Sequence, residues 1–282
     1  MNKNNLTLIG EKLNSKTPML IMLAPAFLTD FKFPDIIHQL KKLGFDKVTE
    51  ITFGAKIVNK EYHKLLKKTN RLVISSPCPG IVHTISHNFP KLKKNLAKID
   101  SPVVAMSKIC KKEYPNHEIT FLSPCEFKKI EASKTKTIDW VIDFEQLKKL
   151  IKEKNIKKPK FKKKNLTFDK FYNDYTKIYP LSGGLSQTAQ INRILKKKEI
   201  KVIDGILNVM EFMKNPDPKI KFVDCLFCDG GCIGGPHTTK KISIDKKSKI
   251  LKQYLKQSKR KSIPENRKGL LKRAKNLKFT KQ

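Results

Sequence analysis

The 282-residue sequence lacks any apolar run long enough to span a bilayer. Its first residues also lack the positive-then-apolar pattern of a secretory signal, so we expect a cytoplasmic protein without a membrane segment. The chain is long enough to bury a substantial core. In a reducing compartment, its six cysteines point to metal or redox chemistry rather than to structural disulfides.

Acidic residues are also scarce, with 25 Asp and Glu against 61 Lys and Arg, which gives a formal net charge of +36. Clustered Lys and Arg would suit nucleic acid, because they neutralise phosphates. Here the charge is mostly Lys, it is spread over nearly every segment, and no recognisable nucleic-acid-binding module accompanies it. A compositional bias of the source explains the excess as well, and we do not expect nucleic acid as a partner.

Apolar runs of strand length alternate with helical patterns along most of the chain. Such alternation is typical of βαβ units, and it predicts an α/β fold with parallel strands. The predicted strands are 18–23, 47–53, 72–74, 119–122, 138–142 and 200–203, and the predicted helices are 6–13, 33–43, 57–68, 81–89, 103–112, 143–154, 188–196 and 205–213. From residue 240 the chain is basic, and its pattern predicts two helical pieces separated by Pro264.

Three of the six cysteines lie within eight residues, in a segment at 225–236 that also holds four glycines. Glycine lets a backbone approach a bulky group closely, as a loop around an inorganic cluster requires. Cys78 and Cys125 lie in similar surroundings, because each comes after an apolar run and a Ser-Pro turn. Thiolates presented in this way suit a metal site.

Four thiolates from three separated segments are a common ligand set for an iron–sulfur cube. Structural zinc accepts four thiolates too, but its usual signature is a pair of Cys-x-x-Cys knuckles in a small domain. Cys110 lies on a helical apolar pattern, which favours a small buried hydrophobe. Cys225 could be a ligand only by displacing another cysteine. The candidate metal ligands are therefore Cys78, Cys125, Cys228 and Cys232.

In this order, the three cysteine segments resemble the signature motifs of the catalytic domain of iron-only ([FeFe]) hydrogenases. That family carries Thr-Ser-Cys-Cys-Pro, then Met-Pro-Cys-x-x-Lys, then Cys-x3-Cys followed by Gly-Gly. This chain has Ser-Ser-Pro-Cys-Pro at 75–79, Ser-Pro-Cys-Glu-Phe-Lys at 123–128 and Cys-Asp-Gly-Gly-Cys-Ile-Gly-Gly at 228–235. The resemblance covers roughly residues 18–240, including Ala-Pro-Ala at 24–26, Phe-Gly-Ala at 53–55 and Ser-Gly-Gly at 182–184.

The resemblance implies a two-lobed α/β domain over residues 1–239, with parallel or mixed sheets flanked by helices and a cluster site between the lobes. Residues 240–282 would follow as a basic, helical C-terminal tail. It also implies an H-cluster: a [4Fe–4S] cluster joined through one thiolate to a two-iron subcluster that carries CO, cyanide and a bridging dithiolate. By motif position, the four candidate cysteines hold the cube, and Cys232 bridges to the two-iron unit.

Further residues carry over by position. Lys128 matches the family lysine that donates to a cyanide ligand, and Glu131 matches a glutamate of the proton path. Glu61 is either a second relay carboxylate or an ordinary carboxylate of a surface helix. The resemblance assigns the walls of the two-iron pocket to Ala24, Pro25, Gly183 and Gly184.

The chain also departs from the family pattern. Pro77 stands where catalytic members have a cysteine that passes protons to the two-iron unit, and proline has no exchangeable proton. General acid–base transfer by a positioned group is worth roughly 10²–10⁴ in rate, so turnover should be slow. Ser123 and Leu226 replace family methionines. The Ser-x-Cys-Pro form of the first motif resembles the branch of the family regarded as sensory.

The ferredoxin-like Cys-x2-Cys-x2-Cys-x3-Cys-Pro runs that many hydrogenases carry do not occur in this sequence. The resemblance therefore implies H₂ and protons as reactants, a ferredoxin-like electron-transfer or signalling protein as partner, and dedicated maturation proteins. We expect H₂ sensing or slow, reversible hydrogenase chemistry. One alternative is a low-rate hydrogenase fed by a separate ferredoxin. The other is a non-catalytic protein that binds or assembles only a [4Fe–4S] cluster.

Overall fold

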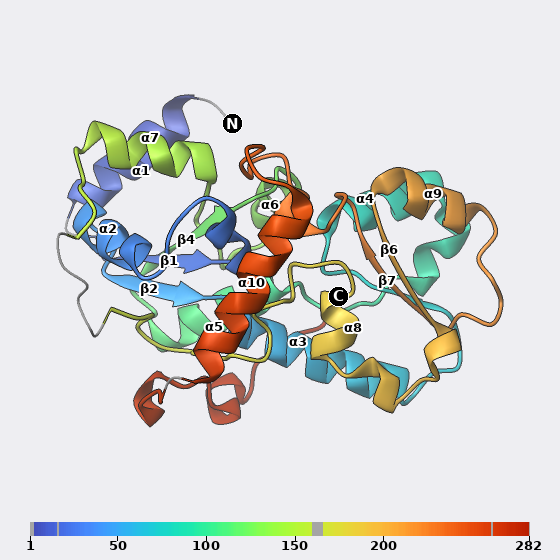
Figure 1. The fold of residues 1–282 in the computed structure, drawn as a ribbon. Coiled ribbons are helices and arrows are strands. Elements are labelled where there is room, and N and C mark those ends of the chain that lie inside the picture. The colour runs from blue at the N-terminus through green and yellow to red at the C-terminus, as the bar shows by residue number, and fades with distance from the viewer. Residues whose placement is uncertain (1–2, 16, 160–165, 261, 282) are drawn as a thin grey trace.

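The computed structural model describes residues 3–15, 17–159, 166–260 and 262–281, and in these ranges the chain forms two parallel sheets, one in each of two lobes (Figure 1). The larger sheet has the strand order β2-β1-β4-β5, and the smaller one β3-β7-β6. Every pair of neighbouring strands is parallel. The strands are β1 (Met19–Leu23), β2 (Lys47–Glu50), β3 (Val73–Ile74), β4 (Glu118–Ser123), β5 (Trp140–Asp143), β6 (Ile200–Asp204) and β7 (Phe222–Leu226). The predicted α/β class is confirmed.

Strand β1 lies inside the larger sheet and all five of its residues are buried. Its alternate side chains enter two different cores, as the two-residue period of a strand requires. Met19, Ile21 and Leu23 pack with α1 (Lys3–Asn14), α2 (Asp35–Leu43) and α7 (Phe144–Glu153). Leu20 and Met22 pack with α3 (Thr52–Leu66) and α5 (Pro102–Glu113) on the opposite face (Figure 1).

The smaller sheet packs its own core against α4 (Pro79–Asn88) and α9 (Ile206–Lys214). Its strands are joined across a large sequence distance, because Val73 of β3 pairs with Phe222 of β7. Helix α3 connects the lobes, since Tyr62 in this helix meets the ring of Phe222 edge-on, with the ring centroids 5.7 Å apart. The two lobes therefore share part of their apolar core.

Helix α10 (Ile244–Lys259) crosses the front of the molecule between the lobes (Figure 1). Its Leu251 is fully buried in a small core with Ala26, Leu181 and Ile233. The second predicted helix of the tail is wrong, because only the short 3-10 turns Glu265–Arg267 and Leu271–Ala274 follow. Within the described ranges, no helix combines the length and apolarity that a bilayer crossing requires.

The predicted helix at 188–196 is also wrong. Helix α8 spans only Gly184–Thr188, and a 3-10 turn, Ile191–Arg193, follows it. Gln190 between them has φ +52°, a left-handed conformation that interrupts a helix. The apolar spacing that predicted one helix therefore belongs to two short turns.

Candidate metal centre

The carboxyl ends of strands from both sheets surround one apolar cavity. This is the position where parallel α/β sheets bind ligands, because the loops that leave the strand ends converge there. The larger lobe contributes wall residues that follow β1, β2 and β4: Ala24, Pro25, Ile51, Thr52, Pro124 and Cys125. The smaller lobe contributes residues that follow β3 and the end of β7 with its loop: Pro77, Cys78, Leu226 and Cys232.

Local turns hold the first two motif cysteines at helix starts. Cys78 is the residue before α4, and Pro79 begins that helix, a position where the missing N–H of proline costs nothing. Cys125 lies two residues after β4, and Ser123 Oγ accepts a 3.1 Å hydrogen bond from its backbone N–H. Backbone N–H groups of Phe127 and Lys128, at the start of α6 (Phe127–Ser133), donate to the Cys125 thiol. Such donors stabilise a thiolate.

The other two motif cysteines lie on a glycine turn after β7. Gly230 and Gly231 have φ values of +73° and +80°, which residues with a side chain rarely adopt. Cys232 begins the 3-10 turn η5 (Cys232–Gly234), and its N–H donates to the Pro180 carbonyl at 2.8 Å. The turn is thereby tied to the segment that precedes α8.

The four thiols are close enough to influence one another. Burial raises the pKa of Cys232, and the charges of Cys78, Cys125 and Cys228 raise it further. Burial likewise raises the pKa of Cys125, and it raises the pKa of Cys228 to about 12. Four thiolates here require a positive counter-charge, which a metal group provides while it deprotonates its thiol ligands.

The spacing of the sulfurs distinguishes two kinds of metal site. A tetrahedral zinc ion with Zn–S bonds of about 2.3 Å places its sulfurs roughly 3.8 Å apart. Among the described residues, the groups compact enough to hold one ion include no set of three cysteines. The cysteines are therefore not gathered as the ligands of a single ion, and four thiolates from separate segments suit a polynuclear cluster.

Lys128 is the only charged residue in the cavity wall as far as the structure describes the chain. Its Nζ donates to the Pro77 carbonyl at 3.1 Å and pairs with Glu131 Oε2 at 2.6 Å. Glu131 also accepts a 2.8 Å hydrogen bond from Ser101 Oγ. The predicted Lys128 and Glu131 thus form a half-buried ion pair, in which Lys128 lines the cavity and Glu131 lies outside its wall.

Of the four residues assigned to the pocket wall, Ala24 and Pro25 lie in it, whereas Gly183 and Gly184 do not. An added Cβ on Gly184 would lie 2.5 Å from two backbone carbonyl oxygens, those of Ile178 and Tyr179. These glycines therefore serve the close packing of a turn. Tyr179 and Pro180, from the same turn, line the cavity in their place.

The remaining candidates lie apart from the cavity. Cys110 in α5 is fully buried, as the prediction of a small buried hydrophobe requires, and burial raises the pKa of its thiol to about 12. Cys225 in β7 is also buried, and its N–H donates to Ser75 Oγ at 3.0 Å. Glu61 in α3 pairs with Lys64 at 2.7 Å and is not part of the cavity wall.

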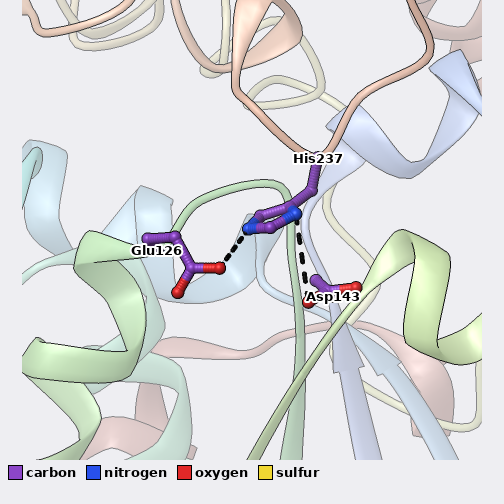
Figure 2. Close-up of side chains that lie close together, drawn as sticks. All are labelled: Glu126, Asp143 and His237. Atoms are coloured by element: carbon purple, nitrogen blue, oxygen red, sulfur yellow. Dashed lines mark hydrogen bonds and ion pairs between the residues drawn. The ribbon is translucent and has the colours of Figure 1, made fainter. Parts of the chain in front are cut away.

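One cluster beside the motifs escaped prediction from the sequence (Figure 2). Nε2 of His237, which follows the third motif, lies 2.5 Å from Glu126 in the second motif, and Nδ1 lies 3.9 Å from Asp143 at the end of β5. The ammonium of Lys129 pairs with both carboxylates, at 2.6 and 3.3 Å. The carboxylates therefore already have a cation, and the cluster ties the loop after Cys232 to the larger lobe.

Fold and site together define an α/β protein. It brings four thiols together where the carboxyl ends of the strands of two parallel sheets meet, next to an apolar cavity. The family model described as "Iron only hydrogenase large subunit, C-terminal domain" matches residues 17–236. The chain therefore belongs to this family, the C-terminal domains of the large subunits of iron-only hydrogenases.

Individual relatives agree with this assignment. The chain is 27% identical to Iron hydrogenase 1 of Clostridium pasteurianum over 265 residues, covering 73% of this chain and 46% of that protein. It is 22% identical to the cytosolic Fe-S cluster assembly factor NAR1 of Encephalitozoon cuniculi, covering 69% and 59%. The chain thus spans about half the length of the curated relatives it matches.

Solved structures share the fold. A variant of the [FeFe]-hydrogenase HydA1 from Chlamydomonas reinhardtii superposes with a TM-score of 0.65 at 15% identity, covering 96% of this chain and 91% of that one. A structure that describes stepwise assembly of the [FeFe]-hydrogenase H-cluster gives a TM-score of 0.65 at 14% identity, with the same coverage.

Proposed function

We propose that this chain holds an H-cluster and uses it for H₂ sensing or slow, reversible hydrogenase chemistry. Cys78, Cys125, Cys228 and Cys232 would hold the [4Fe–4S] cube, with Cys232 also facing the two-iron subcluster. The convergence of these four thiols carries the proposal: Cys78, Cys125 and Cys232 line an apolar cavity with Lys128 in its wall, and Cys228 lies close to the other thiols but outside that wall.

The residues present fit such a group. Apolar side chains dominate the cavity wall, which suits diatomic ligands and excludes water. When bound, the two-iron unit would supply reversible binding and splitting of H₂. The chain would contribute the thiolates, and Lys128 would orient the unit by donating a hydrogen bond. Glu131, 2.6 Å from Lys128 and hydrogen-bonded to Ser101, would serve as a proton-relay group beside the cavity.

The rate should be low, because Pro77 lies in the cavity wall and has no exchangeable proton. Loss of one positioned proton donor costs roughly 10²–10⁴ in rate. A protein with such slow turnover is suited to reporting the redox state of its cluster to a partner. We propose that the partner is a cytoplasmic ferredoxin-like or signalling protein. Dedicated maturation proteins would install the two-iron unit.

Infrared spectroscopy of protein matured anaerobically with a synthetic two-iron precursor tests the proposal. Sharp CO and cyanide stretching bands that shift under H₂ are expected. Iron and sulfide at about four per chain without such bands would instead identify a bare cube. Absence of any iron–sulfur chromophore would refute both assignments.

The bare [4Fe–4S] cube is the second candidate, and one observation favours it. Two of the three donors of the Lys128 ammonium are directed at protein groups, the Pro77 carbonyl and Glu131. The match to a protein named as a cytosolic Fe–S cluster assembly factor is consistent with a non-catalytic role.

Replacement of Lys128 by Ala tests the role that the H-cluster proposal assigns to this lysine. The variant should lose two-iron loading, seen as missing infrared bands, while the visible absorbance of the cube stays unchanged. Lys134→Ala is the matched control, because Lys134 is an exposed residue just after the same helix. Unchanged loading in Lys128→Ala would rule out the role assigned to this lysine.

A further inference from the structure

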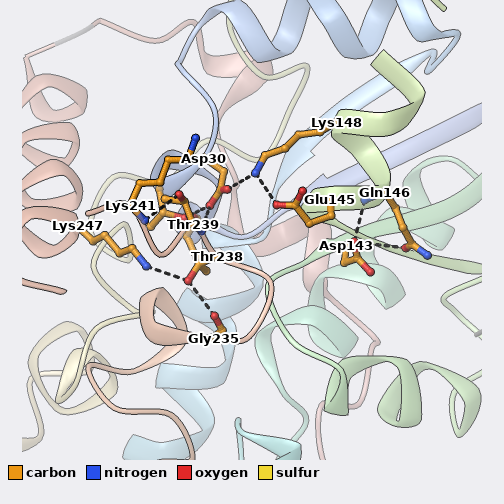
Figure 3. A network of polar contacts seen from close by, with 12 residues as sticks. Asp30, Asp143, Glu145, Gln146, Lys148, Gly235, Thr238, Thr239, Lys241 and Lys247 are labelled. Carbon is orange, nitrogen blue, oxygen red and sulfur yellow. Dashed lines mark hydrogen bonds and ion pairs between the residues drawn. The ribbon is translucent and has the colours of Figure 1, made fainter. Parts of the chain in front are cut away.

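Lys247 in α10 is a buried cation next to the third motif. Only 2% of its surface is exposed, although lysine is almost never fully buried without a charged partner. Within the described ranges, no carboxylate lies within 4.0 Å of its Nζ. The nearby Asp30 is committed elsewhere, to Lys148 at 2.6 Å and to the N–H of Thr239 at 3.0 Å (Figure 3).

The ammonium of Lys247 is aimed at the cysteine turn. Its Nζ donates to the Ile233 carbonyl at 2.9 Å and to Thr238 Oγ1 at 3.0 Å. Thr238 Oγ1 lies 2.9 Å from both the Ile233 and the Gly235 carbonyls, so it joins the two ends of the turn (Figure 3). Ile233 directly follows Cys232 and is fully buried.

A second fully buried lysine, Lys177, shows what is unusual about the charge of Lys247. Lys177 forms an ion pair with the equally buried Glu50, so its charge is matched within the protein. The charge of Lys247 has only a carbonyl and a hydroxyl as immediate partners. Burying a charge is costly unless an opposite charge compensates it. The charge of Asp30 compensates the ammonium in part, and the like charge of Lys240 opposes it. A cluster bound at Cys232, the residue before Ile233, would provide further compensation.

We propose that Lys247 is a positioning residue for the cluster: it fixes the Cys232 turn and supplies a buried positive charge that raises the cluster's reduction potential. This inference rests on the proposed function for the cluster, but its positioning part concerns the protein alone. Reduction adds negative charge to a cluster, and a nearby fixed cation stabilises the reduced form. Removal of the cation should therefore lower the midpoint potential.

The test compares Lys247→Met, which keeps the length of the side chain, with Lys247→Arg, which keeps the charge. Lys249→Met is the matched control, because Lys249 lies on the exposed face of the same helix. A redox titration of the reconstituted cube, followed by electron paramagnetic resonance, should give a lower midpoint potential in Lys247→Met only. Lys247→Arg should restore it at least in part. Equal midpoints in Lys247→Met and Lys249→Met would overturn the charge effect.

Hydrogen exchange of the metal-free full chain tests positioning without any cluster. Amides of residues 231–238 should exchange roughly tenfold faster or more in Lys247→Met, because a charge-assisted hydrogen bond to the turn is lost. Unchanged exchange would overturn the positioning role. Wild-type protein that takes up no cluster would refute the proposed function and the charge effect, while the exchange result would still decide positioning.

Discussion

The two lobes differ in how they are stabilised and in what they give to the site. The larger sheet has four strands, with helices on both faces. The smaller sheet has three strands, of which β3 has two residues and β6 exposes Lys201 and Val202. Yet β3 and β7 of the smaller sheet lead to three of the four motif cysteines, and the larger lobe supplies only Cys125. A well-buried lobe thus serves as the frame for a smaller, ligand-rich one.

A buried ion pair marks the larger lobe. Glu50 at the end of β2 and Lys177 are both fully buried, and Lys177 lies against the rings of Tyr172 and Tyr254, with its Nζ 4.6 and 4.8 Å from their centroids. Burial raises the pKa of Glu50, and the neighbouring charge of Lys177 opposes that rise. Because Tyr254 belongs to α10, the pair also joins this helix to the frame.

The largest effect is expected when this pair is broken. Glu50→Gln leaves Lys177 as an uncompensated buried charge, which should cost about 3–5 kcal/mol in the free energy of unfolding. Urea denaturation measures this loss. Glu211→Gln in the smaller lobe breaks an exposed pair with Lys214 and should change the stability by about 1 kcal/mol or less. Similar losses in the two variants would contradict the contrast between the lobes.

An intermediate effect is expected at the turn between the lobes. In Gly184→Ala, the new Cβ would meet the Ile178 and Tyr179 carbonyl oxygens at 2.5 Å, so backbone must shift. We expect a loss of about 1–3 kcal/mol, measured by thermal or urea unfolding.

Gly10→Ala in α1 serves as the control, because nothing lies within 4 Å of its added Cβ. Alanine should stabilise that helix by about 0.5–1 kcal/mol. The two glycines should therefore respond with opposite signs. An increase in the free energy of unfolding in Gly184→Ala would contradict this prediction, because it would show that the backbone of the turn can move to accept the new Cβ.

The mildest test changes no residue. Iodoacetamide at pH 8 should label half-exposed Cys78 and Cys125 of the metal-free protein before Cys110 and Cys225. Both latter thiols are buried, and burial raises their pKa, which lowers the fraction of reactive thiolate. Mass spectrometry of the labelled peptides gives the order.

Cys110 and Cys225 also compare the lobes directly. Cys110 lies in the core of the larger lobe and Cys225 in that of the smaller one. We expect the smaller lobe to open more readily than the larger one, because its sheet has fewer strands and β6 is partly exposed. Cys225 should therefore react faster than Cys110. Faster labelling of Cys110 would reverse the proposed order of stability.

Local patterns made six of the seven strands that the structure describes predictable, together with the sites of Cys78 and Cys125, because an apolar run followed by a proline turn lies within a few residues of sequence. Strand β7, the central strand of the smaller sheet, was not predicted. The same reasoning failed where contacts between distant segments decide the structure. Gly183 and Gly184 have the composition of a ligand-binding loop, but a packed backbone determines their place. His237 reaches Glu126 across 111 residues.

Lys247 shows the same limit. In the sequence it is one lysine among many in a basic tail, and nothing in its immediate neighbourhood distinguishes it. Its burial depends on the way α10 lies between the lobes, over η5 and the 3-10 turn η1 (Pro25–Thr29). The pattern of the chain after residue 240 predicted a helix there, but not which turn that helix would cover.

The pairing of β3 with β7 also determines when the smaller lobe can form during translation. Ser75 and Cys225 are hydrogen-bonded although 150 residues separate them along the chain. At translation rates of about 5–20 residues per second, β7 emerges roughly 8–30 s after β3. During that interval β3, which leads to Cys78, lacks its partner strand β7. The smaller lobe, and the site with it, can close only after the ribosome has made the third motif, so a cluster would be inserted only after residues 228–235 have been synthesised.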